Sequence, residues 1–272
     1  MPQSPPALSP SDLAALAAAR STLESPGLAM RLSDAVGRPI EKGMARLPAS
    51  WRRRLGGIAQ DALGRAIAVA ARTLDADAGP RTASPRLHKL LGSVSGGAGG
   101  AFGLPGLTVE IPLSTILIMR AILDVARAHG EDINAPATRM AALEVFALGG
   151  PGSADDGIET GYYAVRAALA SAVSDASRHV ASQGLSGLGQ QGAPAIARLL
   201  SMVAARYKVQ LTQKAAGMLV PGVGVGAGVA VNLLFMTHFQ AVSEAHFTIR
   251  RLERRYGTGL VRNAYRTAAG RG

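Results

Sequence analysis

Three ionisable residues stand out because they interrupt an otherwise apolar stretch: Glu110, Arg120 and Asp124. Arg120 and Asp124 are four residues apart, so on a helix their side chains share a face and can pair. Charged groups persist among Ile, Leu, Met and Val only when they are paired and hydrogen-bonded. The pattern predicts either a polar pocket that binds a lipid headgroup or another small anion, or a structural ion-pair network. We favour the network, because structural ion pairs also perturb ionisable groups.

An enzyme, such as a hydrolase, is the alternative use of the same Glu, Arg and Asp side chains, with His246 as a further participant. The sequence lacks a GxSxG nucleophile motif, a P-loop and any cysteine. Catalysis is therefore disfavoured, and we predict neither a catalytic residue nor a cofactor. The lack of cysteine also suits a reducing cytoplasm.

No metal site is predicted from the histidines and carboxylates. His238 and His246 are eight residues apart with no ligand between them at the fourth position, whereas a helical metal-binding pair uses four-residue spacing. Asp155, Asp156 and Glu159 offer oxygen ligands for a divalent cation. A capping box that begins at Asp156 explains Asp156 and Glu159 without one.

Basic residues give the most usable functional signal, since the formal net charge is +11. Trp51 and the three arginines Arg52, Arg53 and Arg54 open an amphipathic helix predicted over residues 49–74, a pattern that fits a membrane interface with Trp51 at headgroup depth. Solvated helix faces are the alternative. Nucleic acid is disfavoured, because the aromatic interleaving of single-strand binders and known DNA-binding motifs are absent. A second basic cluster near the C-terminus contains Arg250, Arg251, Arg254 and Arg255.

Every element that must position these residues is predicted to be a helix. Apolar residues recur at spacings of three and four, and no stretch alternates strictly. Apolar residues make up 48% of the chain but aromatic residues only 4%, which favours close helix packing around small aliphatic side chains. We predict one compact all-α domain over residues 11–257, a mobile Pro/Ser-rich extension at 1–10 and a basic tail at 258–272. Within the domain the main predicted helices cover residues 11–23, 27–46, 49–74, 86–94, 105–129, 134–149, 156–181, 194–220 and 222–256.

Two uncharged, glycine-rich segments, residues 90–109 and 215–237, approach the roughly 20 residues that span a bilayer as a helix. Glycine costs about 1 kcal/mol relative to alanine inside a water-exposed helix. It also lets two backbones approach closely, and Gly224 and Gly228 would share one helix face. We therefore predict that the two segments are tightly packed, buried helices, with reversible or partial membrane insertion as the alternative.

Four separated blocks of the sequence resemble the EcsC family: residues 104–132, 139–150, 159–169 and 232–257. They contain LPGLTVEIPLSTILIM, RMAALEVFALGG, ETGYYAVRAAL and NLLFMTHFQAVSEAHFTIRRLERRYG, and they cover most of the chain after residue 90. The resemblance implies a bacterial, helix-rich, glycine-rich protein with no agreed biochemical activity. The residues that it carries over are Glu110, Pro112, Arg120, Asp124, Glu144, Tyr163, Arg166, His246, Phe247, Arg250, Arg251 and Glu253.

The family takes its name from a gene beside an ABC transporter operon, so the resemblance adds a membrane transporter complex as a predicted partner. The first residues lack the basic and apolar regions of a secretory signal. We predict a non-enzymatic accessory or lipid- and anion-binding protein. It is expected in the cytoplasm, on the anionic surface of the inner membrane.

Overall fold

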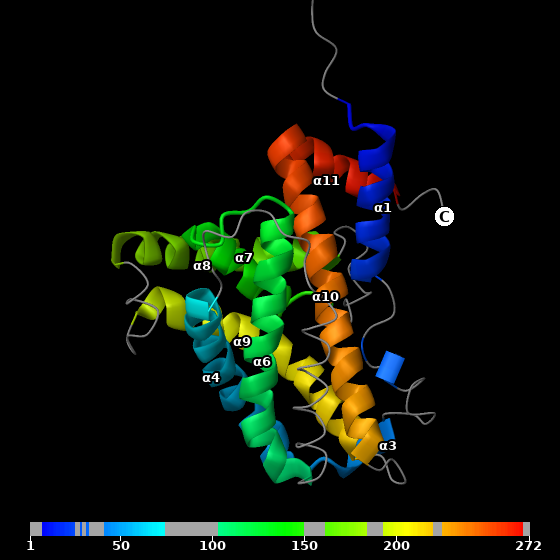
Figure 1. The fold of residues 1–272 in the computed structure, drawn as a ribbon, viewed down its shortest axis with the longest axis vertical. Helices are drawn as coiled ribbons and strands as arrows, with labels where there is room; N and C mark the ends of the chain where they lie inside the picture. Colours follow the sequence, from blue (N-terminus) through cyan, green and yellow to red (C-terminus); the bar gives the residue numbers. More distant parts are fainter. Residues whose placement is uncertain are drawn as a thin grey trace, which may run out of the picture.

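In the computed structural model, helices joined by turns and short loops make up the part of the chain that it describes (Figure 1). The structure describes residues 7–24, 28, 31–32, 41–73, 103–149, 161–183, 193–219 and 225–268. No strand occurs in these ranges, so the prediction of an all-α fold is confirmed. In chain order the helices are α1 (Pro10–Glu24), α3 (Glu41–Arg46), α4 (Ala49–Thr73), α6 (Gly103–Ala128), α7 (Pro136–Val145), α8 (Gly161–Gln183), α9 (Pro194–Met218), α10 (Val225–Tyr256) and α11 (Thr258–Thr267).

Three long helices, α4, α6 and α10, run in the same general direction along the molecule (Figure 1). Helix α6 packs against α4 and α10, and α9 crosses the bundle and contacts α3, α4, α8 and α10. The first turns of α4, α6 and α10 lie at one end of the bundle with α3 and the last turns of α9, which we call the lower end (Figure 1). Helices α1 and α11 pack against α10 at the opposite, upper end.

Helix α1 begins at a capping pattern that Ser9, Pro10 and Asp12 form in the sequence. The Ser9 hydroxyl accepts a hydrogen bond from the backbone N–H of Asp12 at 3.2 Å, so Ser9 caps α1 and Pro10 occupies its first position. Residues 1–6 of the predicted extension lie outside the described residues. The predicted helix at 86–94, the capping box at Asp156 and most of the first glycine-rich segment also lie outside them, as does Gly224 of the predicted glycine pair.

Helix α6 is continuous through Pro112, although a proline inside a helix favours a kink or a break. Proline cannot donate a hydrogen bond to the carbonyl four residues earlier, which belongs to Thr108. Thr108 is on the exposed side of α6, so water can bind that carbonyl. The helix therefore passes the proline without breaking.

The C-terminal segment corrects the predicted domain boundary. Residues 258–267, expected in a basic tail, form α11, and its Val261 and Tyr265 are fully buried. Arg20 of α1 donates a hydrogen bond to the carbonyl of Tyr265 and holds α11 in place. The helical domain thus extends at least to Thr267.

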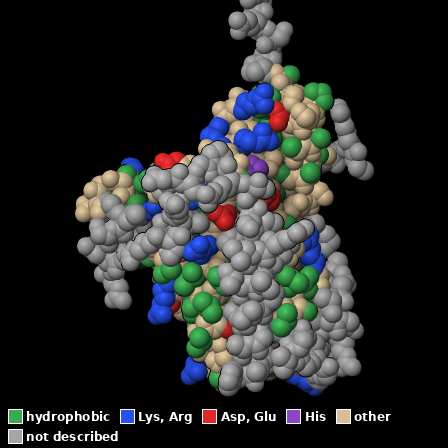
Figure 2. All heavy atoms as spheres, viewed as in Figure 1, with side chains coloured by type: hydrophobic (Ala, Val, Ile, Leu, Met, Phe, Trp, Pro, Cys, Tyr) green, Lys and Arg blue, Asp and Glu red, His purple; other side chains and the backbone are tan. Residues whose placement is uncertain are grey.

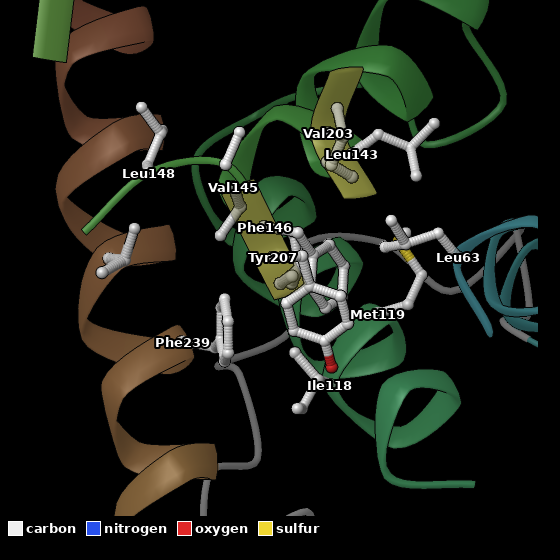
Figure 3. Close-up of a cluster of buried hydrophobic side chains, with 14 of the residues drawn as sticks. Leu63, Ile118, Met119, Leu143, Val145, Phe146, Leu148, Val203, Tyr207 and Phe239 are labelled. Carbon is white, nitrogen blue, oxygen red and sulfur yellow. The ribbon is translucent and has the colours of Figure 1, made fainter. Parts of the chain in front are cut away.

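Three aromatic rings meet at the centre of the bundle. Phe146 contacts Tyr207 edge-on at a centroid distance of 4.9 Å and lies 5.1 Å from Phe239. Figure 3 shows these rings pointing toward one another from three different segments, with Leu63 and Met119 beside them. Around this centre the core consists of Ala, Leu, Ile and Val, as the composition predicts.

Gly43 lies at a close approach between α3 and α9. A methyl group added there would overlap the backbone carbonyl of Ala216, which cannot rotate away. We expect Gly43→Ala to destabilise the protein by about 2 kcal/mol or more. Gly57→Ala is the matched control, because Gly57 is exposed in α4 and its added methyl would have no atom within 4 Å. This variant should be about 0.5–1 kcal/mol more stable than the wild type in urea denaturation; equal effects of both variants would contradict the predicted packing.

Candidate functional site

Five residues singled out in the sequence meet where the start of α8 faces α7 and the second half of α10: Glu144, Tyr163, Arg166, His246 and Glu253. Helix periodicity explains the assembly. On α8, Tyr163 and Arg166 are three residues apart, and on α10, His246 and Glu253 are seven apart, so each pair shares one helix face. We call these residues, together with Tyr162, the α8–α10 cluster.

The strongest contact of the α8–α10 cluster is a two-point ion pair. Arg166 donates from Nη1 to Oε1 of Glu253 at 2.8 Å and from Nη2 to Oε2 at 3.0 Å. The Tyr163 hydroxyl donates to the same Oε1 at 3.1 Å. Paired, largely desolvated guanidinium and carboxylate groups of this kind fix the relative position of two helices.

Tyr162 joins this ion pair to His246. Arg166 Nη1 donates to the Tyr162 oxygen at 3.2 Å, which leaves the Tyr162 proton to bridge to Nδ1 of His246 at 3.1 Å. The remaining imidazole proton is then on Nε2, which lies 3.8 Å from Oε2 of Glu144. Sequence reasoning missed Tyr162, although its four-residue spacing from Arg166 is a usable signal.

Burial controls the charge of the two groups at the end of this chain of contacts. It raises the pKa of Glu144 to about 7, against the opposing effect of the Arg166 and Arg250 cations and with a smaller contribution from Glu253. Burial also lowers the pKa of His246 well below its usual range, assisted by the same two arginines. At neutral pH the imidazole is therefore uncharged and Glu144 is close to its titration midpoint.

The order hydroxyl, imidazole, carboxyl is the order of an acid–base relay, yet it does not open to a substrate. Tyr162 is 3% exposed and His246 is fully buried. A catalytic acid or base must come within hydrogen-bonding reach of the group that it serves. In the described part of the chain the α8–α10 cluster is thus a closed network that joins α7, α8 and α10.

The raised pKa of Glu144 makes a pH-dependent prediction. The pKa in the unfolded chain is the ordinary 4.5, so the folded protein binds more protons between pH 4.5 and 7, and stability falls as pH rises through this window. Glu144→Gln removes that loss and should exceed the wild type by on the order of 2–3 kcal/mol at pH 8 while matching it near pH 4. Chemical denaturation across pH measures both, with the exposed Asp61→Asn as control. A difference of equal size at both pH values would contradict the assignment.

A second buried ionic group lies nearer the lower end and links α6, α9 and α10. Lys214 is fully buried, and its ammonium donates to Oε1 of Glu110 at 2.7 Å, to Asn232 at 2.9 Å and to Ser114 at 3.3 Å. It also lies 4.6 Å from the centre of the Phe235 ring. All three ammonium protons have acceptors, as burial of a charge requires. We call this group the Lys214 centre.

The Lys214 centre corrects the predicted pocket of Glu110, Arg120 and Asp124. Ten residues separate Glu110 from Arg120 on the same helix, which is about 15 Å of helix rise. Glu110 is buried against Lys214, whereas Arg120 and Asp124 are half-buried farther along α6. The structure therefore does not bring the three residues together. Lys214 was not singled out, although it directly precedes the uncharged segment 215–237.

Removal of the cation alone should be costly, because it leaves the Glu110 carboxylate buried without its partner. We expect Lys214→Met to destabilise the protein by about 3–5 kcal/mol. Removing both charges, in Lys214→Met with Glu110→Gln, should restore most of that loss. Urea denaturation of the four proteins in this double-mutant cycle tests the coupling, and simple additivity of the two single effects would refute it.

The basic residues at the start of α4 are exposed, but the helix that carries them does not have the predicted environment. Arg52, Arg53 and Arg54 are exposed, but the apolar face of α4 is buried against α6 and α9. Trp51 itself packs partly against the core. The prediction that this helix lies with its own apolar face in a membrane interface is therefore wrong, because that face is part of the protein core.

The second basic cluster is paired with two distant carboxylates at the upper end. Arg250 pairs with Glu131 at 2.9 Å, and Arg254 also contacts Glu131. Asp12 receives the other two arginines of the cluster, Arg251 at 3.6 Å and Arg255 at 3.2 Å. Tyr256 donates a further hydrogen bond to Asp12 at 2.8 Å. This cluster therefore fastens α1 and the 129–132 turn to α10 instead of facing solvent alone.

Among the described residues no group of three His, Cys, Asp or Glu side chains could hold a metal ion, while Asp155 to Glu159 lie outside them.

One described helix, Leu104–Ala128, has the length and apolar composition of a membrane span, and 56% of its most apolar part is buried inside the protein. A core helix of a soluble protein has the same properties, so this is weak evidence.

Comparison with known proteins gives one family match. The EcsC protein family matches residues 40–252, a range that contains the Lys214 centre and every residue of the α8–α10 cluster except Glu253. Comparisons with curated proteins and with solved structures gave no match. Helices α1 and α11 lie outside the matched range and pack on α10.

Proposed function

We propose that this chain, which belongs to the EcsC protein family, is a non-enzymatic protein. It binds anionic lipid headgroups through its lower end. The observation that carries the proposal is a set of four exposed arginines there, Arg46, Arg52, Arg53 and Arg54. We call them the arginine end. No described acidic side chain forms an ion pair with them.

The arginines at the two ends of the molecule differ in their ion pairing, and this contrast supports the proposal. At the upper end, Glu131 and Asp12 each bind two arginines of α10. At the arginine end, three guanidinium groups follow one another in the first turns of α4 and face solvent. Figure 2 shows Lys and Arg side chains at the lower margin of the visible face. Guanidinium groups bind phosphate oxygens at two points, which suits lipid headgroups.

Helix direction adds to the positive potential of the arginine end. The N-termini of α4, α6 and α10 lie there together, and each carries a partial positive charge from its unpaired backbone N–H groups. None of the three helices has an acidic residue in its first turn to offset that charge. Trp51, half-buried beside the arginines, has the amphipathic ring that is enriched at membrane interfaces.

A hydrolase is not supported by the geometry, because Glu110, Arg120 and Asp124 do not converge and His246 is buried. The cytoplasmic face of an inner membrane is the location that this function implies. A membrane transporter complex remains the predicted protein partner of that location.

Vesicle co-sedimentation tests the proposal. The protein should bind vesicles of phosphatidylglycerol and phosphatidylcholine, fail to bind pure phosphatidylcholine, and dissociate as salt rises, because screening weakens surface electrostatics. Each arginine near an anionic surface contributes about 1 kcal/mol, so changing Arg52, Arg53 and Arg54 to Gln should weaken binding on the order of 100-fold.

The matched control removes the same charge elsewhere: Arg178, Arg198 and Arg266 are exposed, and their replacement with Gln should weaken binding much less. Equal loss in both triple variants would show that only net charge matters. Binding to pure phosphatidylcholine that ignores salt would also contradict the proposal.

A further inference from the structure

We infer that the first half of α6 inserts an apolar stripe, centred on Val109 and Leu113, shallowly among the acyl chains of the bound membrane. This inference rests on the proposed function and adds a second, hydrophobic contact to the arginine end. Val109 has 73% of its surface exposed, the highest value among the exposed large hydrophobic residues, and Leu113 has 47%. The two are one helical turn apart and share a face.

The stripe extends over several turns of α6. Pro105, Val109, Leu113 and the half-exposed Ile116 recur at spacings of three and four. The opposite face of the same turns is buried in the core, where Leu107, Ile111 and Ile118 are at most 1% exposed. The stripe is thus a surplus apolar face, and exposed apolar area of this kind marks an interaction surface.

The polar side chains in these turns of α6 are paired or hydrogen-bonded within the protein, which lowers the cost of taking the stripe out of water. Glu110, the one charged residue between Gly103 and Ile116, points away and is paired with Lys214 in the core. The exposed Thr108 donates its hydroxyl proton to the carbonyl of Pro105 at 2.8 Å. Pro112 has no N–H to desolvate.

Charge complementarity selects lipid as the occupant. Helices α4 and α6 pack against each other and both begin at the lower end, so the stripe lies beside the arginine end (Figure 1). Figure 2 shows apolar side chains over the lower half of α6, with basic side chains below them. With exposed arginines beside it, the apolar strip can enter the acyl-chain region while the long arginine side chains reach the phosphate groups of the same leaflet.

The insertion has a defined limit. Four residues of helix rise about 6 Å, so Val109, nearer the start of α6, should lie deeper than Leu113. Arg120 is half-exposed farther along the same helix and belongs at or above the headgroups. The inferred contact is therefore a shallow wedge, not a membrane span.

The lack of cysteine makes a direct test possible. Single variants Val109→Cys, Leu113→Cys and Leu13→Cys carry an environment-sensitive fluorophore, and vesicles of phosphatidylglycerol and phosphatidylcholine contain spin-labelled quencher lipids. The fluorophore at 109 should shift to the blue and be quenched more than the one at 113. Leu13, 46% exposed on α1 at the upper end, is the control and should remain in water.

The outcomes separate this inference from the proposed function. If labelled protein sediments with anionic vesicles while the fluorophore at 109 stays aqueous, the wedge is refuted and headgroup binding stands. If nothing sediments, the proposed function fails, and the inference with it.

A second pair of variants keeps the test independent of labelling. Val109→Asn with Leu113→Asn, whose arginines are intact, should bind about tenfold more weakly and lose the part of the binding that resists high salt. Leu13→Asn should bind like the wild type. If the wild type is a dimer in solution that the double variant dissociates, the stripe belongs to a second copy of the chain and the inference is overturned.

Discussion

The buried ammonium of Lys214 constrains the rest of the bundle. A charge without water is tolerated only when acceptors surround it, and these come from α6 and α10, while α9 carries the lysine. The three helices must therefore meet in one register at this point. That register sets which residues of α6 face the core and which remain outside, so the position of the exposed stripe follows from a contact in the interior. Likewise, α4 can bury its apolar face only where α6 and α9 are already fixed.

The α8–α10 cluster has the same role at the other end of α10. The pairing of Arg166 with Glu253 joins α8 to α10, and Tyr162 and His246 extend it toward α7. A core built largely from alanine, leucine, isoleucine and valine has few bulky side chains to specify how helices cross. Buried polar contacts supply part of that specificity here, and the three central rings supply another part. Because buried contacts fix the positions of the helices, the surface charges can differ between the two ends of the bundle without changing the helix packing.

Sequence reasoning succeeded where the signal was local. The start of α1 was predictable because Ser9, Pro10 and Asp12 form a capping pattern, and α4 was predicted to within a residue of its observed end. It failed where the partner was remote. Glu110 was grouped with Arg120 and Asp124 because periodicity describes neighbours on one helix, whereas its real partner is 104 positions away. The arginines of α10 appeared free for the same reason, since Asp12 is separated from Arg255 by 243 positions. The sequence also contained the signal for α11, because Val261 and Tyr265 have helical spacing, but its basic composition concealed it.

The shared direction of α4, α6 and α10 has a consequence for the approach to a surface. Helices that point the same way add their peptide dipoles, whereas an antiparallel arrangement would cancel them. A molecule with such a moment experiences a torque in the field of a charged sheet before any atoms touch. It would turn the same end forward during diffusion, so a larger share of collisions would be productive. The fold thus acts on the rate of encounter, separately from how long the complex lasts.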